Sequence, residues 1–280
     1  MMKIISILFF QMIPVIGPAQ DTTDLYPVMK GSLVCWTESR SSPRPLKIHF
    51  TRVDLTCNRL EVITLTGEDP DGAGPAESKL TPPADLFTRY HALVAVNANA
   101  FAGMPGTEKD IRGWYRNRPV DIHGMAVGDG KVVSPVEKGR MPFWTDSANH
   151  PHLGNPKAGD LVWSAVSDWS SPLLLNGIMV PDSTVHVLHP RSALGFDDTG
   201  KWLLLAVVNG RQPGYSEGMS LSELARLFRQ KGCTQAINLD GGGSSIMLIQ
   251  IPKAGIKTVN SPSGLGARPV PVMIGVRAID

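Results

Sequence analysis

The chain has 280 residues, with 27 lysines and arginines against 25 aspartates and glutamates, and a formal net charge of +2. A charge this close to zero, without any basic run, gives no reason to expect binding to nucleic acid or to a membrane surface. Apolar residues make up 42% of the chain, which is typical of a globular protein with a large core.

The N-terminus has the pattern of a secretory signal peptide. Lys3 supplies a positive start, Ile4–Ile16 is mostly apolar, and the small residues of Gly17–Ala19 suit cleavage. The apolar stretch is too short and too interrupted to span a bilayer, and no other stretch is long enough. The pattern predicts a signal peptide over residues 1–19 and one exported domain over residues 20–280, periplasmic or secreted, without stable membrane insertion.

Strand patterns and two cysteines follow the predicted signal peptide. Gly31–Thr37 and Pro45–Leu65 carry the alternation of apolar and polar residues that predicts strands. Cys35 and Cys57 fall in neighbouring segments of this kind; export permits them to pair, and the sequence leaves this open. Cys233 is expected to be a small buried side chain. Because no Cys-x-x-Cys pair or His/Cys cluster occurs, we expect neither a metal site nor a cofactor.

A short helix and a buried strand come next. Thr81, followed by proline, fits the N-cap of a helix that runs towards Tyr90. Ala92–Val96 is apolar throughout, which predicts a buried strand, and the residues from Asn97 to Phe101 follow its end.

The middle of the chain is marked by turns and histidines. Gly128–Lys131 and Asn176–Gly177 have the residues of hairpin turns. His123 precedes the first of these turns, where it can reach a substrate pocket or simply form a hydrogen bond with a neighbour. His150 and His152 have the spacing of one strand face, but no cysteine stands nearby, and they do not indicate a metal site.

A hairpin and a well-marked helix lie in the last third. Ser192–Phe196 and Lys201–Val208 are apolar runs joined by Asp-Asp-Thr-Gly, which favours a turn. Ser220 is a good N-cap, and Glu223 three residues later completes a capping box. Gly232 is placed to be the left-handed residue that ends the helix.

The clearest chemistry lies in Asn238–Ser245, where a predicted strand, Gln235–Asp240, meets three glycines and two serines. Adjacent glycines leave backbone N–H groups uncovered, so an anion can approach them closely, and the serine hydroxyls add donors. Asp240 stands at the strand end, a usual place for a reacting carboxylate. A tight hairpin with a capping aspartate is the alternative. Ser244–Ile251 is predicted to be another strand. The segment is no P-loop, because no lysine follows the glycines.

Three motifs in this order and spacing resemble the phosphodiester glycosidase family, the N-acetylglucosamine-1-phosphodiester α-N-acetylglucosaminidase-like proteins. They are HPRSALG (His189–Gly195), VVNGRQPGYSEGMSLSELA (Val207–Ala225) and NLDGGGSS (Asn238–Ser245). Weaker similarity extends over most of the mature chain and includes Arg268–Val270. The resemblance implies a hydrolase that cleaves the bond between an anomeric carbon and a phosphate in a sugar-1-phosphate diester.

The leaving group of this reaction is a phosphate monoester with a second pKa near ~6, so it needs little protonation. The site needs cationic and N–H donors for the phosphate and a carboxylate for the oxocarbenium-like carbon. We therefore expect catalytic roles for Asp240 and Glu217 as carboxylates, and for Arg191 and Arg211 as fork-shaped phosphate donors. The expected substrate-binding residues are Asn97, Phe101, His123, Asn209, Tyr215, Ser216, Gly241, Gly242, Gly243, Ser244, Ser245 and Arg268.

Three positions depart from the family pattern. Ala98 replaces a glycine, Ala100 replaces an aromatic residue, and Asn209 stands where aspartate is usual. The departures at Ala98 and Asn209 favour a second hypothesis, a non-catalytic glycan-binding protein that assists exopolysaccharide assembly. An intact Asp240 with both arginines favours the enzyme, and a transferase using the same pocket is a third hypothesis.

The sequence as a whole predicts a single α+β domain with mixed or largely antiparallel sheets and few helices. Its expected partner is a phosphorylated glycan or a sugar-1-phosphodiester of the envelope or the extracellular space.

Overall fold

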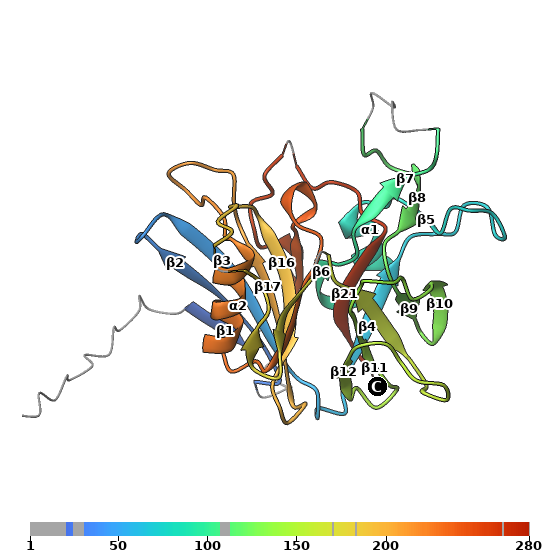
Figure 1. The fold of residues 1–280 in the computed structure, drawn as a ribbon, viewed down its shortest axis with the longest axis horizontal. Helices are drawn as coiled ribbons and strands as arrows, with labels where there is room; N and C mark the ends of the chain where they lie inside the picture. Colours follow the sequence, from blue (N-terminus) through green and yellow to red (C-terminus); the bar gives the residue numbers. More distant parts are fainter. Residues whose placement is uncertain are drawn as a thin grey trace, which may run out of the picture.

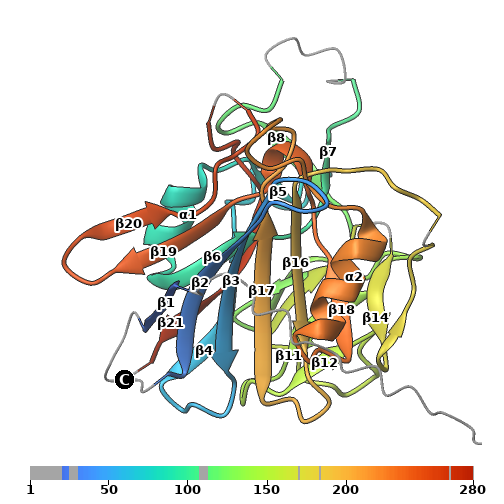
Figure 2. The same ribbon diagram turned by 90° about the vertical axis from the view of Figure 1, so that its left-hand side faces the viewer.

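The computed structural model describes residues 21–24, 31–106, 113–169, 171–182, 184–264 and 266–279, so the predicted signal peptide lies outside the described residues. Two large antiparallel sheets face each other, and each has a helix on its outer side (Figures 1 and 2). In the described part of the chain, no helix is long and apolar enough to cross a membrane.

The larger sheet has eight strands in the spatial order β1-β2-β3-β17-β16-β18-β14-β15. These strands are β1 (Asp21–Asp24), β2 (Leu33–Arg40), β3 (Leu46–Asp54), β14 (Pro172–Leu175), β15 (Ile178–Met179), β16 (Arg191–Phe196), β17 (Trp202–Val208) and β18 (Gln235–Asn238). The two hairpins predicted in this region are confirmed, because β16 pairs with β17 and β14 pairs with β15 across their turns.

The facing sheet has five strands in the order β20-β19-β6-β21-β4. Its strands are β4 (Leu60–Thr66), β6 (Ala92–Asn97), β19 (Met247–Ile251), β20 (Gly255–Thr258) and β21 (Val272–Ala278). The buried strand predicted after the first helix is confirmed as β6, which lies between β19 and β21.

Two smaller sheets complete the strands of the described residues. One has the order β10-β9-β13-β11-β12, and the other β5-β8-β7. Their strands are β5 (Ser78–Lys79), β7 (Phe101–Gly103), β8 (Pro119–Ile122), β9 (Ala126–Gly128), β10 (Lys131–Ser134), β11 (Pro142–Thr145), β12 (Pro151–Leu153) and β13 (Ser164–Ser167). The predicted hairpin turn at 128–131 is confirmed, since β9 pairs with β10 around it.

The main core lies between the two large sheets and follows from strand alternation. Because successive side chains of a strand point to opposite faces, Leu205 and Val207 of β17 enter this core, whereas Leu204 and Ala206 face outward. The outward row packs under α2 (Leu221–Gln230). Burying each such large aliphatic side chain contributes about 1.5–3 kcal/mol.

Helix α2 begins and ends at the predicted residues. The Ser220 hydroxyl accepts a hydrogen bond from the Glu223 N–H (3.2 Å), and the Glu223 carboxylate accepts one from the Ser220 N–H (2.9 Å). Gly232 follows the last turn with φ +91°, in the left-handed region that favours glycine.

Helix α1 (Pro83–Arg89) begins one residue later than predicted. Its N-cap is Pro82, which has no side-chain acceptor, and the Thr81 hydroxyl instead donates to the Lys79 carbonyl (3.1 Å). The prediction of a threonine cap is wrong because proline occupies both of the next two positions and its fixed φ already sets the first turn.

The fold is mostly β, with 8% of residues in helix and 42% in strand, so the predicted α+β class is confirmed only in part. The expectation of few helices and largely antiparallel sheet is confirmed, and no parallel pair occurs among the described strands. Cys35 and Cys57 are not bonded to each other. Cys35 instead contacts the Thr51 hydroxyl at 3.1 Å, and Cys233 is buried as predicted.

Candidate active site

Strand ends from both large sheets meet at one edge of the molecule. Arg191 begins β16 opposite Val208 at the end of β17, and β18 ends beside them at Asn238. In the facing sheet, Met247 begins β19 opposite Val96 at the end of β6. The segments next to these ends carry most of the predicted site residues.

Asn97 ties the two sheets together at Asp240. Its Nδ2 donates to the Asp240 carbonyl (2.6 Å), and its Oδ1 accepts from the Ser192 hydroxyl (2.6 Å) and the Ile246 N–H (3.1 Å). The Asp240 N–H donates to the Ala98 carbonyl (2.8 Å). Asp240 therefore lies two residues beyond the observed end of β18, but both sheets hold its backbone in place. Both the nitrogen and the oxygen of the Asn97 amide thus form hydrogen bonds within the protein.

The Asp240 carboxylate faces the Arg268 guanidinium. Its Oδ2 lies 3.3 Å from Arg268 Nη2, and its side chain is 16% exposed. Burial raises the pKa of Asp240, and hydrogen bonds from Ser244 and the Gly241 N–H together with the charge of Arg268 offset only part of that rise. The Arg268 guanidinium also donates to the Ser244 hydroxyl.

The three glycines form the predicted turn, but their amides are used differently than expected. The N–H groups of Gly241 and Gly242 bond the Asp240 carboxylate and the Pro190 carbonyl, so two of the three amides expected to bind an anion are engaged within the protein. Gly242–Ser244 then forms a single 3₁₀ turn in place of the start of the predicted strand, which begins only at Met247 as β19.

Two guanidinium groups lie against this turn. A Cβ on Gly242, which has φ +60°, would lie 3.1 Å from the Arg211 guanidinium, and one on Gly243 would lie 3.6 Å from that of Arg268. Burial lowers the pKa of Arg268, and the charge of Arg211 lowers it further, against the opposing effect of Asp240. Positive side chains, rather than backbone amides, thus supply most of the attraction for an anion here.

Arg211 is exposed and held by a strained loop. It has φ +59°, unusual for a residue with a side chain. The loop is closed by hydrogen bonds from the Gln212 N–H to the Ser216 carbonyl (3.1 Å) and from the Ser216 N–H back to the Gln212 carbonyl (2.9 Å). Arg211 Nη2 lies 3.2 Å from His189 Nδ1, the only partner that its guanidinium has among the described residues.

Arg191 has a different environment from Arg211. It is 8% exposed, and it donates from Nε to the Met219 carbonyl (2.9 Å) and from Nη2 to the Val187 carbonyl (3.2 Å). Burial lowers the pKa of Arg191 to about 10, with a further contribution from the charge of Arg211. Arg191 therefore holds two backbone segments together and adds positive charge to the site from within.

The remaining polar residues of the 209–217 loop divide into buried and exposed groups. The Ser216 hydroxyl donates to the Asn209 carbonyl (2.7 Å), and Asn209 Oδ1 accepts from the Ser261 N–H (3.1 Å). Tyr215 is 41% exposed, with the Lys47 ammonium 4.5 Å from its ring centroid.

Glu217 is half-buried at the far end of this loop. Its backbone carbonyl accepts a hydrogen bond from the Arg211 N–H, and its N–H donates to the Pro45 carbonyl. Its carboxylate has neither an ion pair nor a hydrogen bond among the described residues. The two predicted catalytic carboxylates, Asp240 and Glu217, are therefore not in direct contact.

Phe101 and Trp114 flank the arginine that faces Asp240. Their rings meet edge to face with centroids 4.9 Å apart, and the Arg268 guanidinium lies 5.4 Å from the Phe101 centroid and 5.9 Å from that of Trp114. Ser245, which ends the 3₁₀ turn, has a buried hydroxyl without a partner among the described residues. The aromatic pair helps to orient Arg268.

His123 is linked to the site through a tryptophan. Its ring stacks on that of Trp169 with centroids 5.7 Å apart, and its Nδ1 lies 3.7 Å from the Glu137 carboxylate. The backbone N–H of Trp169 in turn donates to the Asn238 carbonyl (2.7 Å) at the end of β18.

Sequence reasoning missed His189, Ser192 and Trp114. The first two lie inside the HPRSALG motif, at the start of a predicted strand, and that position is the signal that points to them. Trp114 carries no local pattern, because its contact with Arg268 joins segments far apart in the chain.

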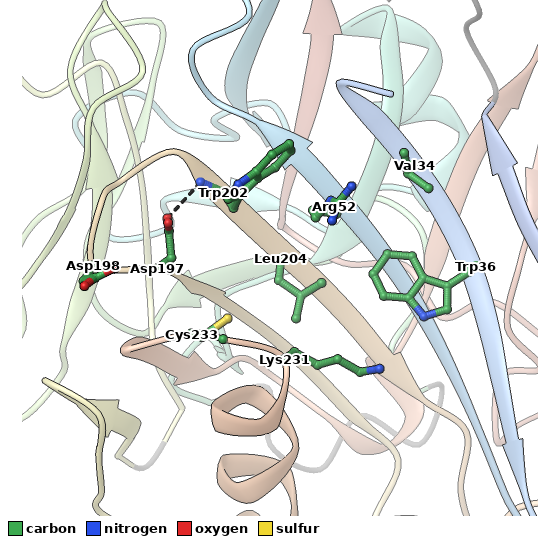
Figure 3. A pocket seen from close by; sticks show the side chains of 10 residues that line it. Val34, Trp36, Arg52, Asp197, Asp198, Trp202, Leu204, Lys231 and Cys233 are labelled. Atoms are coloured by element: carbon green, nitrogen blue, oxygen red, sulfur yellow. Dashed lines mark hydrogen bonds between the residues drawn. The ribbon is translucent and has the colours of Figure 1, made fainter. Parts of the chain in front are cut away.

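The cavity in Figure 3, of about 550 Å³, lies elsewhere, between the end of α2 and the turn that joins β16 to β17. None of the predicted site residues lines it. Three of its four charged groups have partners within the protein: Lys231 pairs with Glu38, Asp197 accepts the backbone N–H of Trp202 (2.9 Å), and the Arg52 guanidinium lies 4.4 Å from the Trp202 ring centroid. The fourth, Asp198, is exposed. No group of three or more metal-ligating side chains occurs in the described part of the chain.

A family model of phosphodiester glycosidases matches residues 90–277, about two thirds of the chain. That range includes the glycine turn, both of its guanidinium groups and the loop between them. The chain therefore belongs to the phosphodiester glycosidase family.

Two solved structures share its fold. A hypothetical protein from Synechocystis is 15% identical, with a TM-score of 0.64 over 92% of this chain and 64% of that protein, so the chain spans less than two thirds of it. The zebrafish N-acetylglucosamine-1-phosphodiester alpha-N-acetylglucosaminidase catalytic domain, auto-inhibited by its pro-peptide, is 18% identical, with a TM-score of 0.63 over 94% of this chain and 85% of that one. A search among curated proteins gives no match.

Proposed function

We propose that this chain is a glycoside hydrolase that cleaves the glycosyl–phosphate bond of a sugar-1-phosphate diester. The observation that carries the proposal is the position of the Asp240 carboxylate, 3.3 Å from Arg268 at a glycine turn that Arg211 also borders. The reaction needs a carboxylate near the anomeric carbon and positive charge near the departing phosphate, and this edge of the molecule offers both.

The bond between the anomeric carbon and the phosphate oxygen breaks, and its electron pair leaves with the phosphate monoester. Arg211 and Arg268 stabilise the charge that develops on the phosphate. Because such a monoester has a second pKa near ~6, its oxygen can leave without a proton at neutral pH. This step therefore needs only one carboxylate, Asp240, which stabilises or attacks the anomeric carbon.

Water then supplies the oxygen of the released sugar, and its proton must go to a base. The raised pKa of Asp240 suits proton acceptance better than that of an ordinary surface aspartate. Glu217, with an unpaired carboxylate on the neighbouring loop, is the second candidate for this role.

The proposed substrate is a phosphorylated glycan of the envelope or the extracellular space, with N-acetylglucosamine as the first sugar to test. The sugar follows from the family and from the zebrafish neighbour. The location follows from the predicted signal peptide. The intact mass of the secreted protein should show the loss of roughly the first ~19 residues, and a secreted form that keeps Met1 would contradict export by this route.

The decisive test is incubation of the purified mature protein with diesters of N-acetylglucosamine-1-phosphate and of glucose-1-phosphate in ¹⁸O-water. A glycosidase places ¹⁸O in the released sugar, because the carbon–oxygen bond breaks. Label in the phosphate would show a phosphodiesterase and overturn the proposal. Binding of oligosaccharide without release of sugar would favour the glycan-binding alternative, and transfer to an added sugar acceptor would favour the transferase.

A further inference from the structure

The contact between His189 and Arg211 fixes the protonation of the imidazole. Arg211 Nη2 lies 3.2 Å from His189 Nδ1. A guanidinium can only donate, so Nδ1 is the acceptor in this hydrogen bond and carries no proton. The imidazole is therefore neutral, and its one proton is on Nε2.

The charges around His189 keep it in this form. Burial lowers the pKa of His189, and the positive charges of Arg191 on β16 and Arg211 on the adjacent loop lower it further. The backbone of Met219 pairs with that of His189. At the preceding residue, the Arg44 guanidinium donates a hydrogen bond to the Gly218 carbonyl, and it also forms an ion pair with Glu223. No carboxylate of the described residues forms an ion pair with the imidazole.

Backbone contacts fix the main-chain positions of His189 and Arg211 relative to each other. His189 and Met219 exchange two backbone hydrogen bonds of 3.0 and 3.3 Å. A Cβ on Gly218 would lie 2.5 Å from the His189 carbonyl oxygen, and one on Gly210 would lie 2.6 Å from the backbone nitrogen of Pro190. The two glycines of the loop therefore permit a close approach of main chains that brings Arg211 beside His189.

We propose that His189 is a positioning residue for anion binding: its unprotonated Nδ1 holds the Arg211 guanidinium against Gly242, and its Nε2–H is left as a neutral donor for the phosphate. This inference rests on the proposed function, because it takes the anion at Arg211 to be the substrate phosphate. Protonation of Nδ1 removes the acceptor and places a third positive charge beside Arg191 and Arg211. The orientation of Arg211 is then lost as the pH falls through the pKa of His189.

Two substitutions separate this role from a merely structural one. His189→Asn places an amide oxygen near the position of Nδ1, where it accepts from Arg211 and does not titrate. His189→Ala leaves Arg211 without an acceptor. His186→Asn is the matched control, since His186 is an exposed histidine of the same segment.

The probe is sulfate, which keeps two charges across the range from pH 5 to pH 8, and its affinity is measured by calorimetry on the whole mature protein. We expect His189→Ala to bind sulfate about 10-fold more weakly than wild type at pH 8. His189→Asn should stay within about 3-fold, and His186→Asn should not differ. On acidification to pH 5, wild type should lose affinity relative to His189→Asn.

Equal sulfate affinity of wild type and His189→Ala would overturn the inference. So would an equal loss in the alanine and asparagine variants, because Nδ1 would then have no special part. If the alanine variant does not fold, as judged by its melting curve, the pH dependence of wild type against His189→Asn decides alone, and parallel curves overturn the inference. Sulfate binding is measured without turnover, so failure of the protein to hydrolyse any diester leaves this result unchanged.

Discussion

The edge at Asp240 and the cavity at the end of α2 both combine charged side chains with aromatic rings, yet they use their charges differently. In the cavity, Lys231 pairs with Glu38, and Asp197 accepts the Trp202 N–H. At the glycine turn, the partner of the Arg211 guanidinium is a neutral imidazole, and Arg268 Nε has no acceptor in the part of the chain that the structure describes. Donors left over after folding, rather than the volume of a cavity, mark the candidate site.

Unsatisfied buried groups strengthen this contrast. Among the residues described, the Asn209 amide nitrogen and the Ser245 hydroxyl, like Arg268 Nε, are buried without hydrogen-bond partners. Each such group costs about 1–3 kcal/mol when no partner is supplied. None of the residues that line the cavity carries a group of this kind among the described residues. The site edge thus retains polar groups that a bound ligand or water can satisfy.

The largest expected effect is that of Asp240→Asn, which keeps the shape and removes the charge. If Asp240 acts at the anomeric carbon, kcat/KM on a sugar-1-phosphodiester should fall by at least ~10²-fold, about 2.7 kcal/mol of transition-state stabilisation. Asp197→Asn in the cavity is the matched control and should retain full activity. An Asp240→Asn enzyme with full activity would remove Asp240 from the mechanism and leave Glu217 as the candidate.

Arg211→Lys tests the second half of the contrast, the unpaired positive charge. Lysine keeps the charge but loses the planar fork, so a two-point contact with phosphate is lost. We expect kcat/KM to fall by about 10–100-fold, or about 1.4–2.7 kcal/mol. Arg52→Lys in the cavity, assayed in parallel, should change kcat/KM by less than about 2-fold, and a comparable fall in both variants would erase the distinction between the two regions.

The sequence predicted those parts of the fold and site that depend on nearby residues. The cap of α2 needs only Ser220 and Glu223, three residues apart, and the existence of a turn after Asp240 follows from its adjacent glycines. The different environments of Arg191 and Arg211 could not be predicted. They depend on the carbonyl of Met219, 28 positions from Arg191, and on a left-handed backbone at Arg211.

The fold class was predicted only in part, for a related reason: few helices and largely antiparallel sheets were expected, but not how strongly β-structure dominates. Strand patterns were predicted segment by segment, but how the sheets pack and how little of the chain becomes helical depend on contacts between distant segments. The amides of the glycine turn show the same limit. Their partners include the Pro190 carbonyl, about 50 positions upstream of Gly242, which no local pattern indicates.

A smaller effect concerns stability against pH. Burial raises the pKa of Asp240, so the folded protein binds this proton more tightly than the unfolded chain does. The associated stability is therefore fully present below the unfolded pKa of about 3.9 and is lost as the pH rises through the raised folded pKa. Chemical unfolding from pH 4 to pH 7 should show Asp240→Asn gaining stability relative to wild type as the pH rises.

Glu223, in the first turn of α2, should contribute a pH dependence of stability opposite to that of Asp240. Burial alone would raise the pKa of Glu223, but hydrogen bonds from Arg44 and Ser220 lower it overall. Its contribution is present above the unfolded pKa and is lost as the pH falls through the lowered folded value. Glu223→Gln should therefore lose stability relative to wild type as the pH rises from 4 to 7. If Asp240→Asn also loses stability relative to wild type as the pH rises, the assignment of a raised pKa to Asp240 is wrong.

The smallest effect is expected from Ser220→Ala, which removes the N-cap hydroxyl of α2. The Glu223 N–H then lacks its acceptor, and the free energy of unfolding should fall by about 1 kcal/mol, or ~2–4 °C in melting temperature for a chain of this size. Ser220→Asp restores an acceptor and should recover most of this loss. The activity of Ser220→Ala tests whether α2 and the site edge are independent. Ser220 follows Met219, whose carbonyl accepts a hydrogen bond from Arg191. We expect kcat/KM within about 2-fold of wild type, since that bond uses only the backbone of Met219. A variant that loses activity in step with its melting temperature would show that the helix and the site edge act as one unit.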